Sequence, residues 1–242
     1  MNVFRWQNCY ADVQTYRHGR TIQTYLEDVI VPALETLDRK TDELEARGGA
    51  WAAFAKPDMQ FVIRETKLAF SLAIQSIWER QLRAYLLGCA KELCPTEDLQ
   101  SKIERADWEK LQKLFFRLRG IELCVFPSFG VLDILQNLGS AARHGDGGSA
   151  VKLIHQCPDL WEHLPAQVFE DEAPLVYRTV AMIDVPVDRL KDFAKAVAVF
   201  WEDSEYIYNE SIERKDPQLE EKLARERLTR QWIPRLSRPS TK

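Results

Sequence analysis

Apolar residues recur at helical spacing along most of the chain. The stripe in the first clear helix follows the i, i+3, i+4, i+7 pattern and consists of Ile22, Tyr25, Leu26, Val29, Ile30, Ala33, Leu34 and Leu37. Pro32 lies inside this stripe, and because proline lacks an N–H we expect a kink there rather than the end of the helix. Gly48 and Gly49 predict where the helix ends.

The next segment, residues 57–95, is apolar on nearly every side of a helix and is bracketed by Pro57 and Pro95. So wide an apolar surface predicts a helix at the buried centre of a bundle. Glu79 interrupts this surface, one turn after Gln75. A buried carboxylate must be paired, because burying a lone charge costs several kcal/mol. The candidate partners are Arg83, Arg143, His144 and a residue of a second copy. The alternative is that Glu79 lies at the edge of the bundle in solvent.

Four further segments carry an amphipathic pattern. They are residues 96–120, 126–145, 149–157 and 188–208. Glycines at 120 and 145 are expected to end the first two helices, and Ser149 is of the type preferred at an N-cap. Apolar and polar residues alternate near 176–186, which predicts one short β-hairpin.

Together these elements predict an all-α fold, an up-and-down helical bundle in one domain. We expect an N-terminal arm over residues 1–20, the bundle over 21–212 and a charged helical tail over 213–242. No internal repeat is found at a spacing of 20–50 residues.

The composition is that of an ordinary globular protein. Apolar residues make up 45%, and charged residues make up 29% with a net charge of −4, so a chain-wide basic surface is excluded while a local patch is not. No apolar run approaches the 18 residues of a membrane span, and no signal peptide is evident at the N-terminus. We therefore expect a cytoplasmic protein without a membrane segment.

The five cysteines are odd in number and form no C-x-x-C pair. This pattern favours reduced thiols in the cytoplasm over a disulfide framework. The spacing of His155, Cys157 and His163 matches no common zinc site, so we expect no metal and no other cofactor.

The candidate chemistry lies in "NLGSAARHGDGGSAVKL", residues 137–153. At about 100° per residue, one polar stripe runs along the preceding helix, with Arg143 at its edge. The members of the stripe are Asp133, Asn137, Ser140 and His144. In a purely structural interpretation the loop consists of a helix stop, a turn and a cap at Gly145, Asp146, Gly147, Gly148 and Ser149. Alternatively, the N–H groups of this loop could cradle a phosphate.

A helical chain with "RHG" at the end of a late helix, then "GDGGSAVKL", and later Phe200-Trp201, resembles the HEPN superfamily. The resemblance covers roughly residues 21–208. It implies a helical bundle that dimerises, and many members are metal-independent ribonucleases of toxin–antitoxin and other defence systems. The implied general base or acid is His144, which would act on a ribose 2′-hydroxyl.

The family's arginine precedes the histidine by four to six intervening residues, and this chain has Asn137, Leu138 and Gly139 there. Arg143, the nearest cation, would then stabilise the phosphate, from the same chain or from a second copy. Asn137 and Asp146 would orient these groups, and Glu79 would support them.

The resemblance implies a protein that acts on or binds RNA, as a metal-independent endoribonuclease of a bacterial toxin or defence module. Its partners would be a second copy of itself and an antitoxin or other protein. The alternative is a catalytically inactive HEPN-like module for dimerisation, nucleotide binding or partner binding. The tail over residues 222–242 holds seven basic residues against Glu226 alone, and with Trp232 it could contact RNA. A solvated terminal helix or a handle for a partner would show the same composition.

Overall fold

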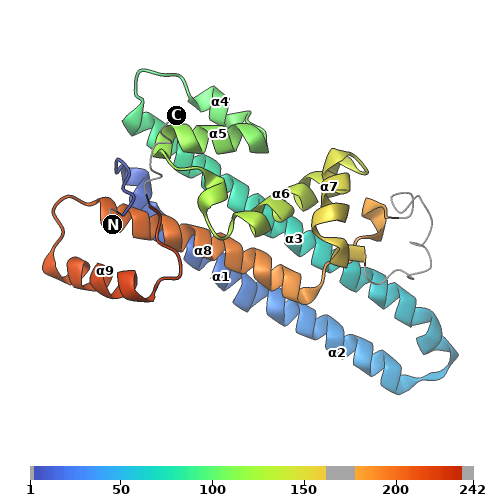
Figure 1. Ribbon diagram of the computed structural model, residues 1–242. Helices are drawn as coiled ribbons and strands as arrows, with labels where there is room; N and C mark the ends of the chain where they lie inside the picture. The colour runs from blue at the N-terminus through green and yellow to red at the C-terminus, as the bar shows by residue number, and fades with distance from the viewer. Residues whose placement is uncertain (1–2, 162–177, 236–242) are drawn as a thin grey trace. The chain divides into compact units, whose positions relative to one another are not determined.

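The computed structural model describes residues 3–161 and 178–235, which are mostly helical (Figure 1). The α-helices are α1 (Thr15–Tyr25), α2 (Val31–Arg47), α3 (Gly49–Leu93), α4 (Gln100–Glu104), α5 (Trp108–Arg119), α6 (Phe129–His144), α7 (Gly148–Gln156), α8 (Val187–Ser211) and α9 (Pro217–Thr229). Within the described ranges the only β pairing is an isolated antiparallel bridge between Val3 and Arg235. The prediction of an all-α fold is confirmed.

The β-hairpin predicted near residues 176–186 is wrong for the part that the structure describes. Residues Val180–Met182 form a 3-10 turn. The N–H of Val180 donates to Asp146 at 2.7 Å, and the N–H of Asp184 donates to the Leu160 carbonyl at 2.9 Å. These backbone groups are thus satisfied by loop partners rather than by a neighbouring strand. Residues 176 and 177 lie outside the described residues.

The chain folds into two compact units, each assembled from segments that are far apart in the sequence. Unit 1 comprises Met1–Arg20, Glu79–Gly130 and Ala198–Lys242, and unit 2 comprises Thr21–Trp78 and Val131–Val197. The boundaries fall inside α1, α3, α6 and α8. This division differs from the predicted arm, bundle and tail at residues 1–20, 21–212 and 213–242.

Both ends of the described chain belong to the aromatic core of unit 1. Phe4 and Trp6 are each 7% exposed, and Leu223 of α9 is fully buried. They join a core in which the rings of Phe200 and Trp201 lie 5.0 Å apart, edge to face. The first residues and α9 are therefore parts of a packed unit, because their apolar side chains are needed to complete it.

The predicted helix over residues 96–120 is two helices, α4 and α5, separated by a short turn. Arg83 of α3 fixes this turn by donating to the carbonyls of Ile103 (2.5 Å), Glu104 (3.2 Å) and Ala106 (2.7 Å). Asp107 then caps α5 by accepting the N–H of Lys110 at 2.9 Å. The break depends on a long-range partner, which is why local periodicity did not predict it.

In unit 2, α2 and the first part of α3 form an antiparallel pair joined at Gly48 and Gly49 (Figure 1). Both glycines have positive φ, +59° and +80°, which confirms the predicted helix end. A π-helical turn over Leu26–Ile30 directly precedes α2, and helical structure continues through Pro32 as predicted, while the kink expected at this residue stays a prediction.

The apolar surface of α3 is buried mainly in its second half. The helix begins at Gly49 and continues through Pro57, so it is longer than predicted. Trp51 is 63% exposed and Phe54 is 80% exposed, whereas Ile74 is fully buried. A wide apolar surface therefore predicted the buried segment correctly but did not show where burial begins.

Candidate functional site

The end of α6 has the predicted form of a helix stop. Gly145 has φ +80°, and its N–H donates to the Ala141 carbonyl at 2.7 Å. The N-cap of α7 was expected at Ser149. It is instead Gly147, two residues earlier, and Gly148 is the first residue of the helix. A side chain at Gly147 or Gly148 would meet open space, so only Gly145 needs to be glycine for its backbone.

The polar stripe of α6 is covered by α7, which lies against it (Figure 1). The Asn137 amide donates to Asp133 and to Gln156, both at 3.3 Å, and only 7% of Asn137 is exposed. Seven residues earlier on α7, Ser149 donates to the Ser140 hydroxyl at 3.0 Å. Three of the four predicted stripe residues thus form a partly buried polar contact between two helices.

Arg143 folds back along α6 instead of extending past its end. Its Nε donates to the Gly139 carbonyl and its Nη2 to the Gln75 side-chain oxygen, both at 2.7 Å. Gln75, which is 1% exposed, in turn donates to Gln136 at 2.8 Å. A Cβ at Gly139 would lie 2.8 Å from Gln75 and 2.9 Å from the Arg143 guanidinium. Gly139 therefore permits the close approach that anchors Arg143.

The remaining predicted site residues have separate roles. His144 is exposed, and no hydrogen bond joins its imidazole to another described residue. Asp146 accepts the backbone N–H of Val180 and so fastens the chain that follows residue 177. Glu79, in unit 1, is paired with Arg83 at 2.6 Å, which is one of the expected partners.

The structure therefore joins Asp133, Asn137 and Ser140 to α7, and it ties Arg143 to α3. His144 presents its imidazole to solvent at the end of α6. Gln156 was not among the predicted site residues, although its spacing from Ser149 places both on one face of α7. That spacing was the signal for a helix that covers the polar stripe.

The basic tail is largely neutralised where the structure describes it. Four basic side chains make ion pairs: Lys222 with Glu205, Arg225 with Glu221, Arg227 with Glu210 and Arg230 with Asp203. The Trp232 ring lies 5.1 Å from that of Phe126, in the core of unit 1. The charges at these four positions are thus paired, and the Trp232 ring is partly occupied by its contact with Phe126, so this segment is less suited to contacting RNA than its composition suggested. Residues 236–242 lie outside the described residues.

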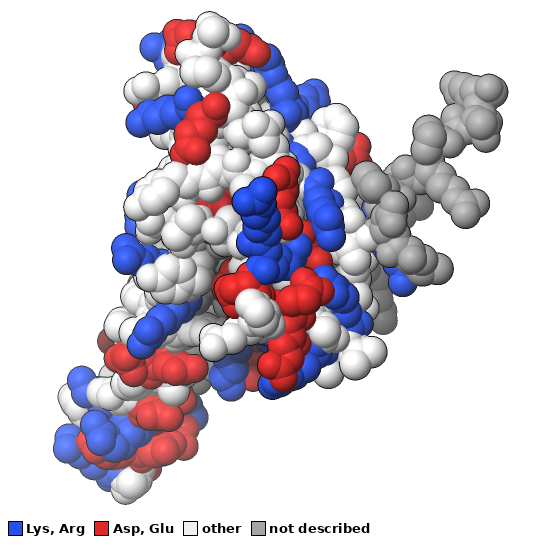
Figure 2. Space-filling view, turned by 90° about the vertical axis from the view of Figure 1, so that its left-hand side faces the viewer, with Lys and Arg blue, Asp and Glu red and all other residues white. Residues whose placement is uncertain are grey.

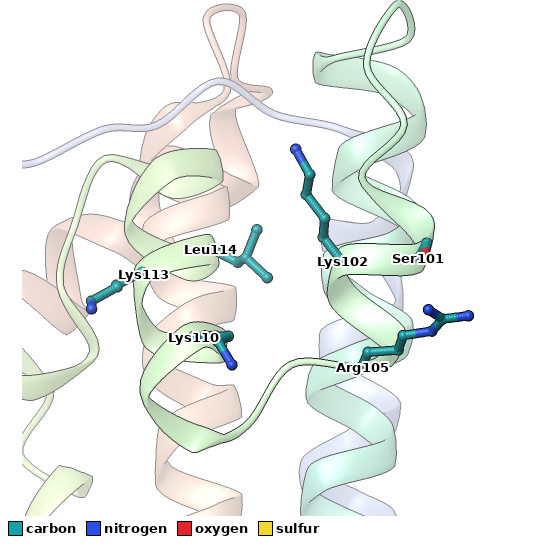
Figure 3. Close-up of a pocket in the computed structure, with 6 residues that line it drawn as sticks. All are labelled: Ser101, Lys102, Arg105, Lys110, Lys113 and Leu114. Carbon is teal, nitrogen blue, oxygen red and sulfur yellow. The ribbon is translucent and has the colours of Figure 1, made fainter.

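A hollow of about 440 Å³ opens between α4 and α5 in unit 1 (Figure 3). Its lining consists of Ser101, Lys102, Arg105, Lys110, Lys113 and Leu114. Figure 3 shows Leu114 and Lys102 extending into the gap from opposite helices. Lys110 and Lys113 are paired with Asp107 and Glu109, whereas no ion pair joins Lys102 or Arg105 to another described residue.

This hollow is the kind of local basic site that the net charge left open. On the face drawn in Figure 2, basic and acidic side chains are interspersed, in keeping with the small net charge. Cationic side chains around an apolar surface such as that of Leu114 can bind a ligand that joins an anionic group to an apolar or aromatic part. Its lysines and arginine were scattered in the sequence among acidic residues, so no run of basic residues marked it.

Among the described residues no group of three or more His, Cys, Asp or Glu side chains is placed to hold a metal ion. His163, one of the residues considered for zinc, lies outside the described residues. No helix in the described part of the chain is long and apolar enough to cross a membrane.

In comparisons with known proteins, no family model matches the chain, and no curated protein or solved structure matches it. The resemblance to the HEPN superfamily therefore stays a prediction that depends on the residues around His144.

Proposed function

We propose that this protein is a HEPN-like module that binds RNA through the basic hollow between α4 and α5. The observation that carries the proposal is a cavity lined by four cationic side chains, with Lys102 and Arg105 outside any ion pair to a described residue. Phosphate groups bind such side chains and release counterions, which supplies most of the affinity in sequence-independent binding.

The contacts of α6 support binding without catalysis. A ribonuclease of the expected kind needs a cation that stabilises charge on the phosphate beside the histidine. Arg143 instead donates to Gln75 and to its own helix, and Asn137 is covered by α7. In this proposal the end of α6 has a structural role and no catalytic one. The protein would then be the catalytically inactive module that was the alternative.

Binding is tested with a fluorescently labelled single-stranded RNA, whose anisotropy is measured between about 50 and 200 mM salt. We expect Lys102→Ala/Arg105→Ala to weaken binding and to reduce the slope of log K against log salt by about one for each lost phosphate contact. The matched control is Arg39→Ala/Lys40→Ala, which removes the same charge from exposed positions on α2. Wild-type protein that fails to bind at low salt, or equal affinities for the two variants, would contradict the proposal.

A second candidate is a metal-independent endoribonuclease, and the observation in its favour is the exposed imidazole of His144. The test is incubation of the full chain with total RNA in EDTA. Cleavage that is lost in His144→Ala but kept in His155→Ala, an exposed histidine on α7, supports this candidate. Absence of cleavage by the wild type, or equal cleavage by wild type and His144→Ala, rules it out.

The proposal includes a homodimer in the cytoplasm, with an antitoxin or another protein as a further partner. These features come from the resemblance to HEPN proteins and from the composition. Light scattering of the purified chain tests the dimer directly. A monomer at the protein concentrations used in the RNA-binding assay would contradict the proposed homodimer.

A further inference from the structure

Two cysteines from distant parts of the chain meet in unit 1. Cys9 lies just before the 3-10 turn Tyr10–Gln14, and Cys89 lies in α3. Their Sγ atoms are 3.5 Å apart, and the residues are 7% and 0% exposed. Gly88 permits this approach, because a Cβ there would lie 2.7 Å from the Cβ of Ala11. The packing of the N-terminal segment on α3 therefore holds the two thiols in contact.

A buried cation lies beside both sulfur atoms. Nη1 of Arg119 is 3.8 Å from each Sγ, and the guanidinium lies 3.9 Å from the centroid of the Trp6 ring. Asp12 balances this charge, with its carboxylate oxygens 2.8 and 3.1 Å from Nη2 of Arg119. Asp12 also accepts the Tyr85 hydroxyl at 2.8 Å. A nearby cation favours the thiolate, which is the nucleophilic form of cysteine.

The two thiols have different acidities. The hydrogen bond with Cys89 lowers the pKa of the Cys9 thiol, against the smaller opposing effects of burial and of the Asp12 carboxylate. The hydrogen bond with Cys9, followed by burial, raises the pKa of the Cys89 thiol. Cys9, which is also the more exposed of the two, is therefore suited to attack, and Cys89 is suited to follow as the second thiol.

We propose that Cys9 and Cys89 form an oxidisable pair that a hydroperoxide converts into an intramolecular disulfide. The Cys9 thiolate attacks one peroxide oxygen, so that an S–O bond forms, the O–O bond breaks and the leaving hydroxide is protonated to water. Cys89 then attacks the Cys9 sulfur. The S–S bond forms as the S–O bond breaks, and the departing hydroxide takes the Cys89 proton. Two thiols are oxidised by two electrons, and hydrogen peroxide is reduced to two molecules of water.

The closing movement is small compared with the present separation. A disulfide has an S–S distance of about 2.05 Å, so the sulfurs must approach by about 1.5 Å from their 3.5 Å contact. The modification does not require the proposed RNA binding, because neither cysteine, nor Asp12 or Arg119 beside them, lines the hollow between α4 and α5.

The experiment treats the full-length native protein with hydrogen peroxide, quenches it with catalase and alkylates the remaining thiols in denaturant. Digestion without reductant and mass spectrometry then locate any cross-link. We expect the Cys9 and Cys89 peptides to be joined with the loss of two hydrogens before Cys124 is oxidised. Cys124 is the internal control because its side chain is accessible to peroxide but its thiol is less acidic. The part of its surface that is covered, followed by the hydrogen bond to Glu122, raises the pKa of the Cys124 thiol.

Three variants sharpen the result. Cys124→Ser should keep the cross-link, and Cys9→Ser should abolish it. Cys89→Ser should leave a sulfenic acid on Cys9 that dimedone traps. Oxidation of Cys124 while both Cys9 and Cys89 are still alkylated would overturn the proposal, and so would a cross-link of Cys9 to any other cysteine. Both of these outcomes can be observed in the wild-type protein, so the test does not depend on the folding of a variant.

Discussion

The ion pair between Asp12 and Arg119 allows a sharp test of the packing in unit 1. Neither side chain is accessible to solvent, and Asp12 also accepts the Tyr85 hydroxyl and the N–H of Cys9, both at 2.8 Å. Replacing Asp12 with alanine leaves the guanidinium of Arg119 buried without its counter-charge. Removing one partner of a buried pair costs about 3–5 kcal/mol, and so Asp12→Ala should lower the free energy of unfolding by that amount.

Two comparisons separate the charge from the rest of the side chain. Asp12→Asn keeps an acceptor for one hydrogen bond and should lose less stability. The double variant Asp12→Asn/Arg119→Met removes both charges together, and it should be more stable than the sum of the two single losses predicts. Glu109→Ala is the matched control, because its pair with Lys113 is exposed and should leave stability unchanged within error.

Urea unfolding followed by tryptophan fluorescence measures these differences, and the aromatic core of unit 1 supplies the signal. A loss of less than about 1 kcal/mol for Asp12→Ala would refute the reasoning, since that is the size of an average substitution. It would mean that Arg119 finds water or another anion once Asp12 is gone.

Three further predictions follow, two for single residues and one for the disulfide cross-link. Gly139→Ala should cost about 1–3 kcal/mol in urea unfolding, because its methyl group meets neighbours at 2.8 and 2.9 Å, whereas Gly147→Ala meets open space and should not. Burial lowers the pKa of His18 to about 4 from 6.5, so the unfolded chain takes up the proton first. Thermal melts should therefore show full stability above pH 6.5 and a decline toward pH 4, and His18→Gln should flatten that decline. Oxidation of Cys9 and Cys89 should raise the melting temperature, since the residues are 80 positions apart and a closed loop of this length is worth up to about 4.5 kcal/mol. A melting temperature that falls on oxidation would contradict this.

Much of the helical framework followed from local patterns. Gly120 and Gly145 end helices as predicted, because each adopts a positive φ that other residues avoid. The stripe from Asp133 to His144 was also placed on one face of a helix. What the pattern could not provide was the element covering that face, so three residues suited to a cleft turned out to contact α7.

Where the structure departs from expectations based on local pattern, the cause is a partner far away in sequence. Arg83 divides residues 96–120 into two helices by binding carbonyls that follow it by about twenty positions. The N-terminal segment was expected to be an arm, yet Trp6 lies against Arg119 in a buried core. Short-range periodicity carries no information about such contacts, because loop closure and burial decide them.

The segmental construction of unit 1 has a consequence for synthesis on the ribosome. Its core includes Phe4 near one end of the described chain and Leu223 near the other. Phe4 must therefore wait, without its final neighbours, until the more than two hundred residues that lead to Leu223 have emerged. Nascent chains that expose apolar surface for so long are the ones that chaperones bind, so unit 1 should depend on such protection more than unit 2.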